Sequence, residues 1–100
     1  MRESNLWFNK AGEPITSEQG AKLHMDYGYR TIGDDYVKGL HISTVWLGIS
    51  HSFSGGPPII FETMVFGAEG QSLKQRRYHT EAEARKGHKE MVKLAREGSH

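Results

Sequence analysis

Residues 40–67 read LHISTVWLGIS, HSFSGGPP and IIFETMVFG in succession. Two apolar runs, rich in residue types that favour a pleated sheet, flank a short segment of His, Ser, Gly and Pro. This pattern predicts a strand, a loop and a strand. No other stretch of the chain is as apolar or as continuous, so we expect these two strands to form the centre of a small antiparallel sheet.

The sequence predicts further strands on both sides of this centre. Residues 29–37 read as a strand, and the tight turn at Lys38-Gly39 joins it to the strand at 40–50 because Gly tolerates positive φ. Residues 67–74 are polar and contain Gly, which predicts a loop. Residues 75–79 are short and basic, as suits an edge strand.

Two helices are predicted from the spacing of capping boxes, in which a Thr is followed three residues later by Gln or Glu. The two pairs are Thr16 with Gln19, and Thr80 with Glu83. They predict helices at 17–25 and 81–97. In the second, residues with helical spacing define a packing face. That face comprises Ala84, Gly87, His88, Met91, Leu94 and Ala95. Gly87 on it predicts a close approach of helix to sheet.

The central strands carry apolar residues on both faces, which is typical of strands covered on both sides. In the second of the two apolar runs, at 59–67, alternate residues point to opposite faces of the sheet and so form two sets. The first set is Ile60, Glu62, Met64 and Phe66, and the second is Ile59, Phe61, Thr63 and Val65. The helices can cover one face, so we expect the other to be available to a second subunit, as in a homodimer or larger oligomer. The sequence leaves open which face Trp46 shares.

The length of 100 residues is that of one domain, spanning 1–100. We predict an α+β fold: a four- or five-stranded, mainly antiparallel sheet with two helices, the longer one C-terminal. Residues 98–100 are either native or the remains of an expression tag.

The composition excludes several classes of protein. Lys and Arg number 13 and Asp and Glu 12, so the chain lacks the basic excess of a duplex-binding protein, although a small anion needs only two or three cations. The absence of cysteine excludes disulfides and thiolate metal sites and favours the cytosol. No run approaches the length of a membrane span, so we expect no membrane partner.

The loop at 51–58 is the strongest candidate site, because it is longer than a common hairpin loop and carries hydroxyls, a His and a Gly pair. Free backbone N–H groups in such a loop can receive an anion. The candidate ligand-binding residues are His51, Ser52, Ser54, Gly55 and Gly56. The alternative is a plain connector in which Pro57-Pro58 starts the next strand.

Glu62 is a carboxylate in an otherwise apolar strand, where burial without a partner is costly. We expect Glu62 to pair with Arg30, Arg76 or Arg77. Alternatively, it accepts a hydrogen bond from Trp46 or from a ligand. The other possibility is that the face of the strand that carries Glu62 is exposed to solvent at this position. We favour a structural or interface pairing over catalysis.

Arg76, Arg77 and Tyr78, followed by His79, form the only compact cationic cluster outside the second helix. Arg matches phosphate geometry and Tyr can stack on a base, so these residues are candidate ligand contacts together with Trp46. The alternative is an edge strand that its charges keep soluble.

The chain contains no sequence motif of a metal site, a phosphate-binding loop or a catalytic nucleophile. The six histidines form no HxH pair and no HExxH helix, so we expect neither metal nor cofactor, and His88 is expected to pack in the helix. A binding protein is favoured over an enzyme. A hydrolase that uses His51 and Glu62 remains the enzymatic alternative.

Several ordered blocks resemble a family of small proteins encoded by tailed bacteriophages. They are ISTVWLGISHSF at 42–53, GPPIIFETMVFG at 56–67, RRYHTEAEA at 76–84 and GHKEMV at 87–92. WFNKAGEPI at 7–15 is similar in kind. The resemblance covers residues 5–97 and implies a phage gene product that acts in the cytoplasm of the bacterial host. It implies no particular reaction.

Together, the resemblance and the candidate loop favour a non-enzymatic counter-defence protein. Its expected ligand is a small anionic nucleotide messenger of host immunity, which it would sequester. The alternative is a protein–protein inhibitor of a host defence effector or host enzyme, similar to an anti-CRISPR protein. In that case Trp46, Phe53 or Phe66 is expected to anchor the partner, as aromatic residues do in interface hot spots.

Overall fold

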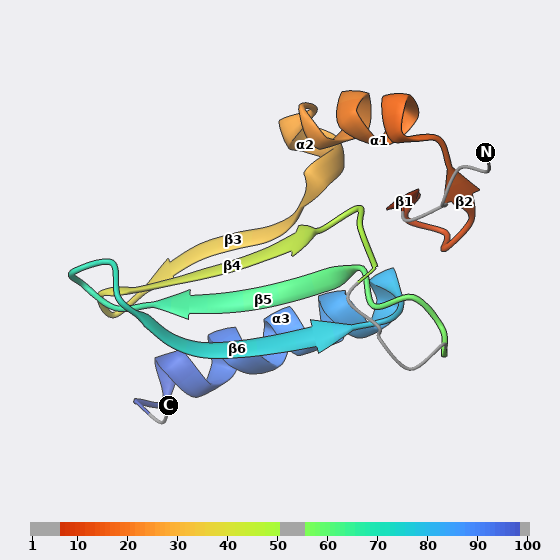
Figure 1. Cartoon of the computed structure of the whole chain (residues 1–100). Coiled ribbons are helices and arrows are strands. Elements are labelled where there is room, and N and C mark those ends of the chain that lie inside the picture. The colour runs from red at the N-terminus through yellow and green to blue at the C-terminus, as the bar shows by residue number, and fades with distance from the viewer. Residues whose placement is uncertain (1–6, 51–55, 99–100) are drawn as a thin grey trace.

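A computed structural model describes residues 7–50 and 56–98 (Figure 1). A four-stranded antiparallel sheet has the strand order β3-β4-β5-β6, and a separate two-stranded sheet pairs β1 with β2. The elements, in chain order, are β1 (Trp7–Phe8), β2 (Pro14–Ile15), α1 (Ser17–His24), α2 (Tyr27–Arg30), β3 (Thr31–Val37), β4 (Leu40–Trp46), β5 (Phe61–Phe66), β6 (Ser72–Tyr78) and α3 (Glu81–Arg96). The predicted α+β class and the long C-terminal helix are confirmed.

Helix α3 lies along one face of the four-stranded sheet (Figure 1). One core cluster combines three strand residues with three helix residues. It contains Leu40, Ile42, Val65, Met91, Val92 and Ala95. The predicted packing face of α3 differs from the structure at two positions: Val92 is buried but was not predicted, and Leu94 was predicted but is only half-buried. Both lie close to the edge of the helical stripe, so small rotations decide between them.

The pairing register places Trp46 opposite Phe61, and both side chains are fully buried on the face that carries α3. The indole Nε1 of Trp46 donates a hydrogen bond to the carbonyl oxygen of Phe8, 2.9 Å away. The rings of Trp7 and Tyr29 also pack against Trp46. The N-terminal elements therefore cover the end of the sheet where β4 ends.

Both predicted capping boxes are present. The hydroxyls of Thr16 and Thr80 accept from the backbone N–H of Gln19 and Glu83, each over 3.1 Å. The predicted close approach at Gly87 is also confirmed. A Cβ at this position would lie 2.1 Å from the hydroxyl oxygen of Tyr78, so only glycine lets this ring pass under the helix.

The strand predicted at 29–37 is wrong at its start. The side chain of Asp26 caps a single helical turn, α2, by accepting from the N–H of Tyr29, and β3 begins only at Thr31. Gly28 therefore lies inside this helical turn. The Lys38-Gly39 turn is confirmed, with φ of 51° and 80° at the two residues.

Two further boundaries differ from the prediction. Strand β4 ends at Trp46 rather than near residue 50, because Gly48 has φ of 85° and turns the chain away. Strand β6 begins at Ser72, within the segment predicted as a loop, and its pairing with β5 is irregular between Val65 and Phe66. The position of β6 at the edge of the sheet is confirmed.

Candidate functional site: the open face of the sheet

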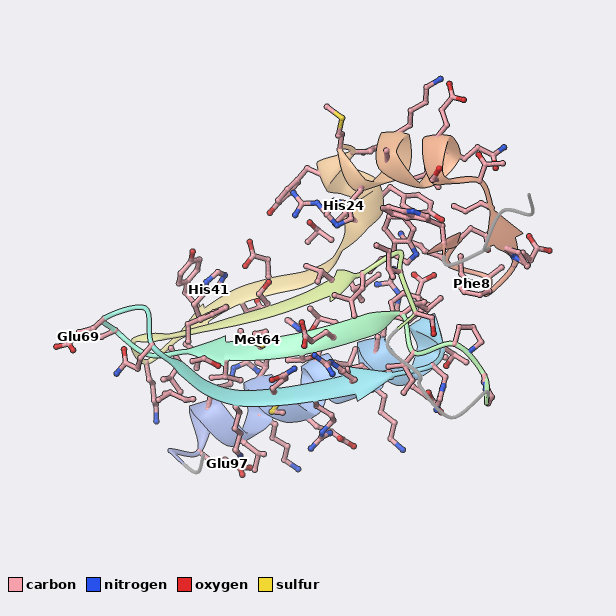
Figure 2. The ribbon with its side chains drawn as sticks, viewed as in Figure 1. Phe8, His24, His41, Met64, Glu69 and Glu97 are labelled. Atoms are coloured by element: carbon pink, nitrogen blue, oxygen red, sulfur yellow. The ribbon has the colours of Figure 1, made fainter. Side chains whose placement is uncertain are left out.

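The sheet face opposite α3 carries a second set of side chains, which we call the open face. Burial alternates strictly along β4 and β5, and the intermediate positions belong to this face. Its residues are Asp34 and Tyr36 on β3, His41, Ser43 and Val45 on β4, Glu62, Met64 and Phe66 on β5, and Gln75 and Arg77 on β6. Figure 2 shows His41 on the side of the sheet away from α3.

Three rings form a row across the open face. The register aligns Tyr36 with His41 and His41 with Phe66, on three neighbouring strands. The Tyr36 and His41 rings are stacked, with centroids 4.3 Å apart and planes 8° apart. The Phe66 ring lies 5.7 Å from the His41 ring and is tilted by 36°. Tyr36 is 75% exposed, so the row offers a large aromatic surface to a partner.

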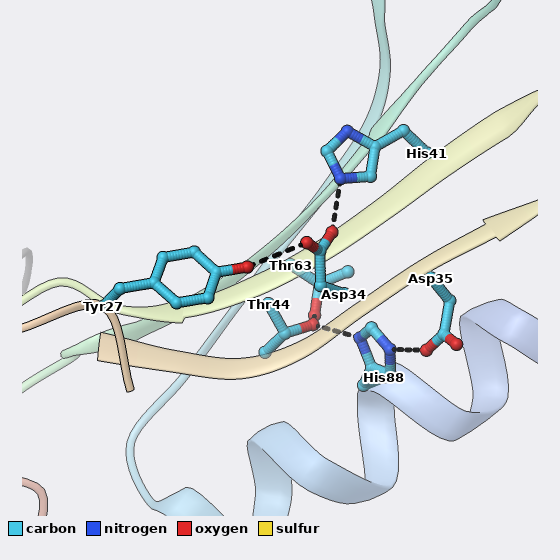
Figure 3. Close-up of polar contacts among 7 residues, drawn as sticks. All are labelled: Tyr27, Asp34, Asp35, His41, Thr44, Thr63 and His88. Carbon is cyan, nitrogen blue, oxygen red and sulfur yellow. Dashed lines mark hydrogen bonds and ion pairs between the residues drawn. The ribbon is translucent and has the colours of Figure 1, made fainter. Parts of the chain in front are cut away.

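A carboxylate holds this row in place (Figure 3). One oxygen of Asp34 lies 2.5 Å from Nε2 of His41, and the other accepts a hydrogen bond from the hydroxyl of Tyr27 at 3.1 Å. The contact makes Nε2 of His41 the donor and fixes the ring orientation. The aromatic row is therefore preorganised by residues of α2 and β3.

A second carboxylate lies at the opposite end of the face. The Oε2 atom of Glu62 accepts from Nε of Arg77 at 3.1 Å and from Nε2 of Gln75 at 2.5 Å. The predicted pairing of Glu62 with an Arg is thus confirmed, and the partner is Arg77. The alternative donor Trp46 lies on the other face of the sheet.

A chain of hydrogen bonds runs beneath the sheet, between the strands and α3. Asp35 contacts Nε2 of His88 at 2.7 Å, and Nδ1 of His88 contacts Oγ1 of Thr44 at 2.7 Å (Figure 3). Thr44 then bonds to Thr63 at 2.5 Å, and Thr63 to the hydroxyl of Tyr78 at 3.0 Å. The buried members of this chain are Thr44, Thr63, His88 and Tyr78, and each has a partner, as burial requires.

The order Asp35, His88, Thr44 has the connectivity of a catalytic triad, in which a carboxylate orients a His beside a hydroxyl. Thr44 has no exposed surface, so no substrate can reach its hydroxyl. We therefore assign this network a structural role. His88 packs in the helix as expected. The sequence signals for the network were His88 on the predicted packing face of the helix and two threonines in the central strands.

In the structure, the residues of the predicted cationic cluster do not share one surface. Arg76 pairs with Glu90 of α3 at 2.9 Å, whereas Arg77 lies on the open face. Tyr78 is only 7% exposed and is held by Thr63. The two arginines and the tyrosine therefore do not converge on one ligand, and neither Tyr78 nor the buried Trp46 presents a free ring face.

Four of the predicted ligand-binding residues, His51, Ser52, Ser54 and Gly55, lie outside the described residues, and so does Phe53, a predicted partner anchor. Gly56 is described and exposed. Close to it, Nδ1 of His79 donates to the carbonyl oxygen of Pro58 at 3.1 Å, which ties the end of the loop to the end of β6. The contact places Pro58 at the end of the sheet remote from the aromatic row, because the Tyr78 end of β6 pairs with Phe61.

Sequence reasoning missed Tyr36, His41 and Asp34 as site residues. None of the three belongs to a sequence motif. The available signal was the tight turn at Lys38-Gly39, which fixes the hairpin and sets Tyr36 directly opposite His41.

No protein-family model, curated protein or solved structure matches this chain. Among residues 7–50 and 56–98, no group of three or more His, Cys, Asp or Glu is arranged to hold a metal ion. None of the described helices is long and apolar enough to cross a membrane. The functional argument consequently depends on the geometry of the open face.

Proposed function

We propose that this chain is a non-catalytic binding protein that docks a partner protein on the open face of its sheet. The observation that carries the proposal is the aromatic row of Tyr36, His41 and Phe66, which is preorganised by Asp34 and covered by no other described element. Rigid, partly exposed aromatic residues are typical anchors of protein interfaces, because little conformational entropy is lost when they are buried.

The charges of the open face favour a protein over a polyanion. The face carries two carboxylates, Asp34 and Glu62, and one cation, Arg77, which is already paired with Glu62. A phosphate backbone requires several unpaired cations. We therefore expect a partner surface with an apolar centre opposite Met64 and Phe66 and with Lys or Arg near Asp34.

The resemblance to tailed-phage proteins suggests where such a partner is found. A phage product made in the host cytoplasm meets host defence effectors and host enzymes, so we propose that the docked protein is one of these and that docking inhibits it. Capture of a nucleotide messenger by Arg76, Arg77 and Tyr78 gains no support, because these side chains do not converge on one site. Each contacts a different residue: Glu90, Glu62 and Thr63, respectively.

Affinity capture tests the proposal with Tyr36→Ala as the diagnostic variant. Because Tyr36 is 75% exposed, its truncation should leave the fold intact while removing an anchor. Lysate from phage-infected or defence-activated bacteria should yield one stoichiometric host protein with the wild type, and the purified pair should bind more than about tenfold more weakly after Tyr36→Ala.

The matched control is Met25→Ala, which truncates an apolar side chain that is 85% exposed at the end of α1. This variant should retain the partner with unchanged affinity. Equal retention by wild type and Tyr36→Ala, or loss of the partner from both variants, would contradict the assignment to the open face. Sedimentation of the purified chain alone tests a second copy as the occupant, which Tyr36→Ala would then dissociate.

A further inference from the structure

A hollow of about 370 Å³ lies among the N-terminal elements, away from the open face. It lies where β2, α1 and α2 meet, and its size is within the range of small-molecule sites. The residues that line it are Asn9, Ile15, Gln19, Lys22, Leu23 and Tyr29. None of them belongs to the predicted loop or to the cationic cluster of β6.

The floor of the hollow is apolar and fixed. Ile15, Leu23 and Tyr29 pack against the core cluster that contains Trp46. The hydroxyl of Tyr29 accepts a hydrogen bond from the backbone N–H of Lys10 at 2.9 Å, and its ring meets the Trp46 ring edge-on at 5.1 Å. The floor is therefore formed before any ligand arrives, which reduces the entropic cost of binding.

The rim of the hollow offers hydrogen-bond donors. Lys22 lines the hollow and forms no ion pair with any carboxylate in the part of the chain that the structure describes. Lys10 is not a lining residue, but its Nζ is also free of ion pairs there and lies 4.5 Å from the centroid of the Tyr29 ring, which is part of the lining. The Oε1 atom of Gln19 is occupied by the N–H of Thr16, so the amide N–H groups of Gln19 remain to donate.

We infer that this hollow binds a small planar organic anion. The planar body lies against Ile15, Leu23 and Tyr29, and the anionic group lies at the ammonium group of Lys22, with Lys10 beside the Tyr29 ring as a second source of positive charge. Aromatic carboxylates and nucleoside monophosphates share this chemistry. The inference is independent of partner docking, because no residue of the hollow belongs to the open face.

Calorimetric titration with four probes tests the inference on the full chain. Benzoate and AMP carry the charge, and benzamide and adenosine are their neutral counterparts. We expect at least one anion to bind about tenfold or more tightly than its neutral counterpart. Tighter binding of AMP identifies a nucleotide as the ligand, and tighter binding of benzoate identifies an aromatic carboxylate.

Two charge-removing variants locate the site. Lys22→Gln and Lys10→Gln keep most of each side chain, and each should weaken the bound anion several-fold. Lys93→Gln, an exposed lysine in the last turn of α3, should leave it unchanged, as should Tyr36→Ala. Absence of binding by both anions at millimolar concentration, equal binding of neutral and charged probes, or unchanged binding in both lysine variants would overturn the inference.

Discussion

The hydroxyl of Thr44 provides the sharpest test of the buried network, and the perturbation is Thr44→Val. Valine has the shape of threonine with a methyl group in place of the hydroxyl, so the substitution opens no cavity. It removes the contacts of Oγ1 with Thr63 at 2.5 Å and with Nδ1 of His88 at 2.7 Å. Thr63 keeps the hydroxyl of Tyr78 as a partner, whereas Nδ1 of His88 keeps none among the described residues.

The cost follows from these contacts. Each lost hydrogen bond removes a net contribution of about 1 kcal/mol, and an unsatisfied buried group costs about 1–3 kcal/mol. Burial of a methyl group instead of a hydroxyl offsets part of this. We expect Thr44→Val to lower the free energy of unfolding by about 2 kcal/mol. For a domain of 100 residues, that corresponds to a fall in Tm of roughly 8–16 °C.

Urea denaturation monitored by tryptophan fluorescence measures this difference, because Trp46 is fully buried. The matched control is Ser43→Ala, one residue earlier on the same strand but on the open face. That change should stay within about 0.5 kcal/mol of wild type, as is usual for surface substitutions. Equal stability of Thr44→Val and wild type would refute the reasoning that the network is structural.

Three further substitutions test the packing and the surface charges by the same denaturation assay. Gly87→Ala should destabilise by about 1–3 kcal/mol although Ala is the better helix former, because its Cβ would overlap Tyr78; a gain in stability would contradict the close approach. Gly33→Ala should also destabilise, since its Cβ would lie 2.6 Å from Nε2 of His88, and an unchanged midpoint would refute this contact. Arg77→Ala should cost less than about 1 kcal/mol because Arg77 is 41% exposed and Glu62 keeps another donor; a larger loss would show that the pair is more than a surface contact.

The parts of the fold that local chemistry determines could be predicted from the sequence. The capping boxes at Thr16 and Thr80 define where α1 and α3 begin, and the Lys38-Gly39 turn defines the β3-β4 hairpin. Helix α2 was missed because a single turn capped by Asp26 has no periodic apolar pattern to reveal it.

The candidate site was less predictable, because it depends on register across the sheet. A shift by one residue would exchange the two faces of β4 and β5, and the loop between these strands does not fix that register. Trp46 and Tyr78 were therefore candidates for ligand contact, although both are buried on the helix side. The row formed by Tyr36 and His41 follows only once strand pairing is known.

The central claim is that the open face is the docking surface, and methyl NMR of methionine tests it most directly. Met64 lies on the open face, Met25 is exposed directly after α1 and Met91 is buried under the sheet. With ¹³C-methyl labelling and the captured partner added, we expect the Met64 signal to shift or broaden while the Met25 and Met91 signals stay in place. A shift of Met25 with Met64 unchanged would contradict the account and place the partner on the N-terminal elements.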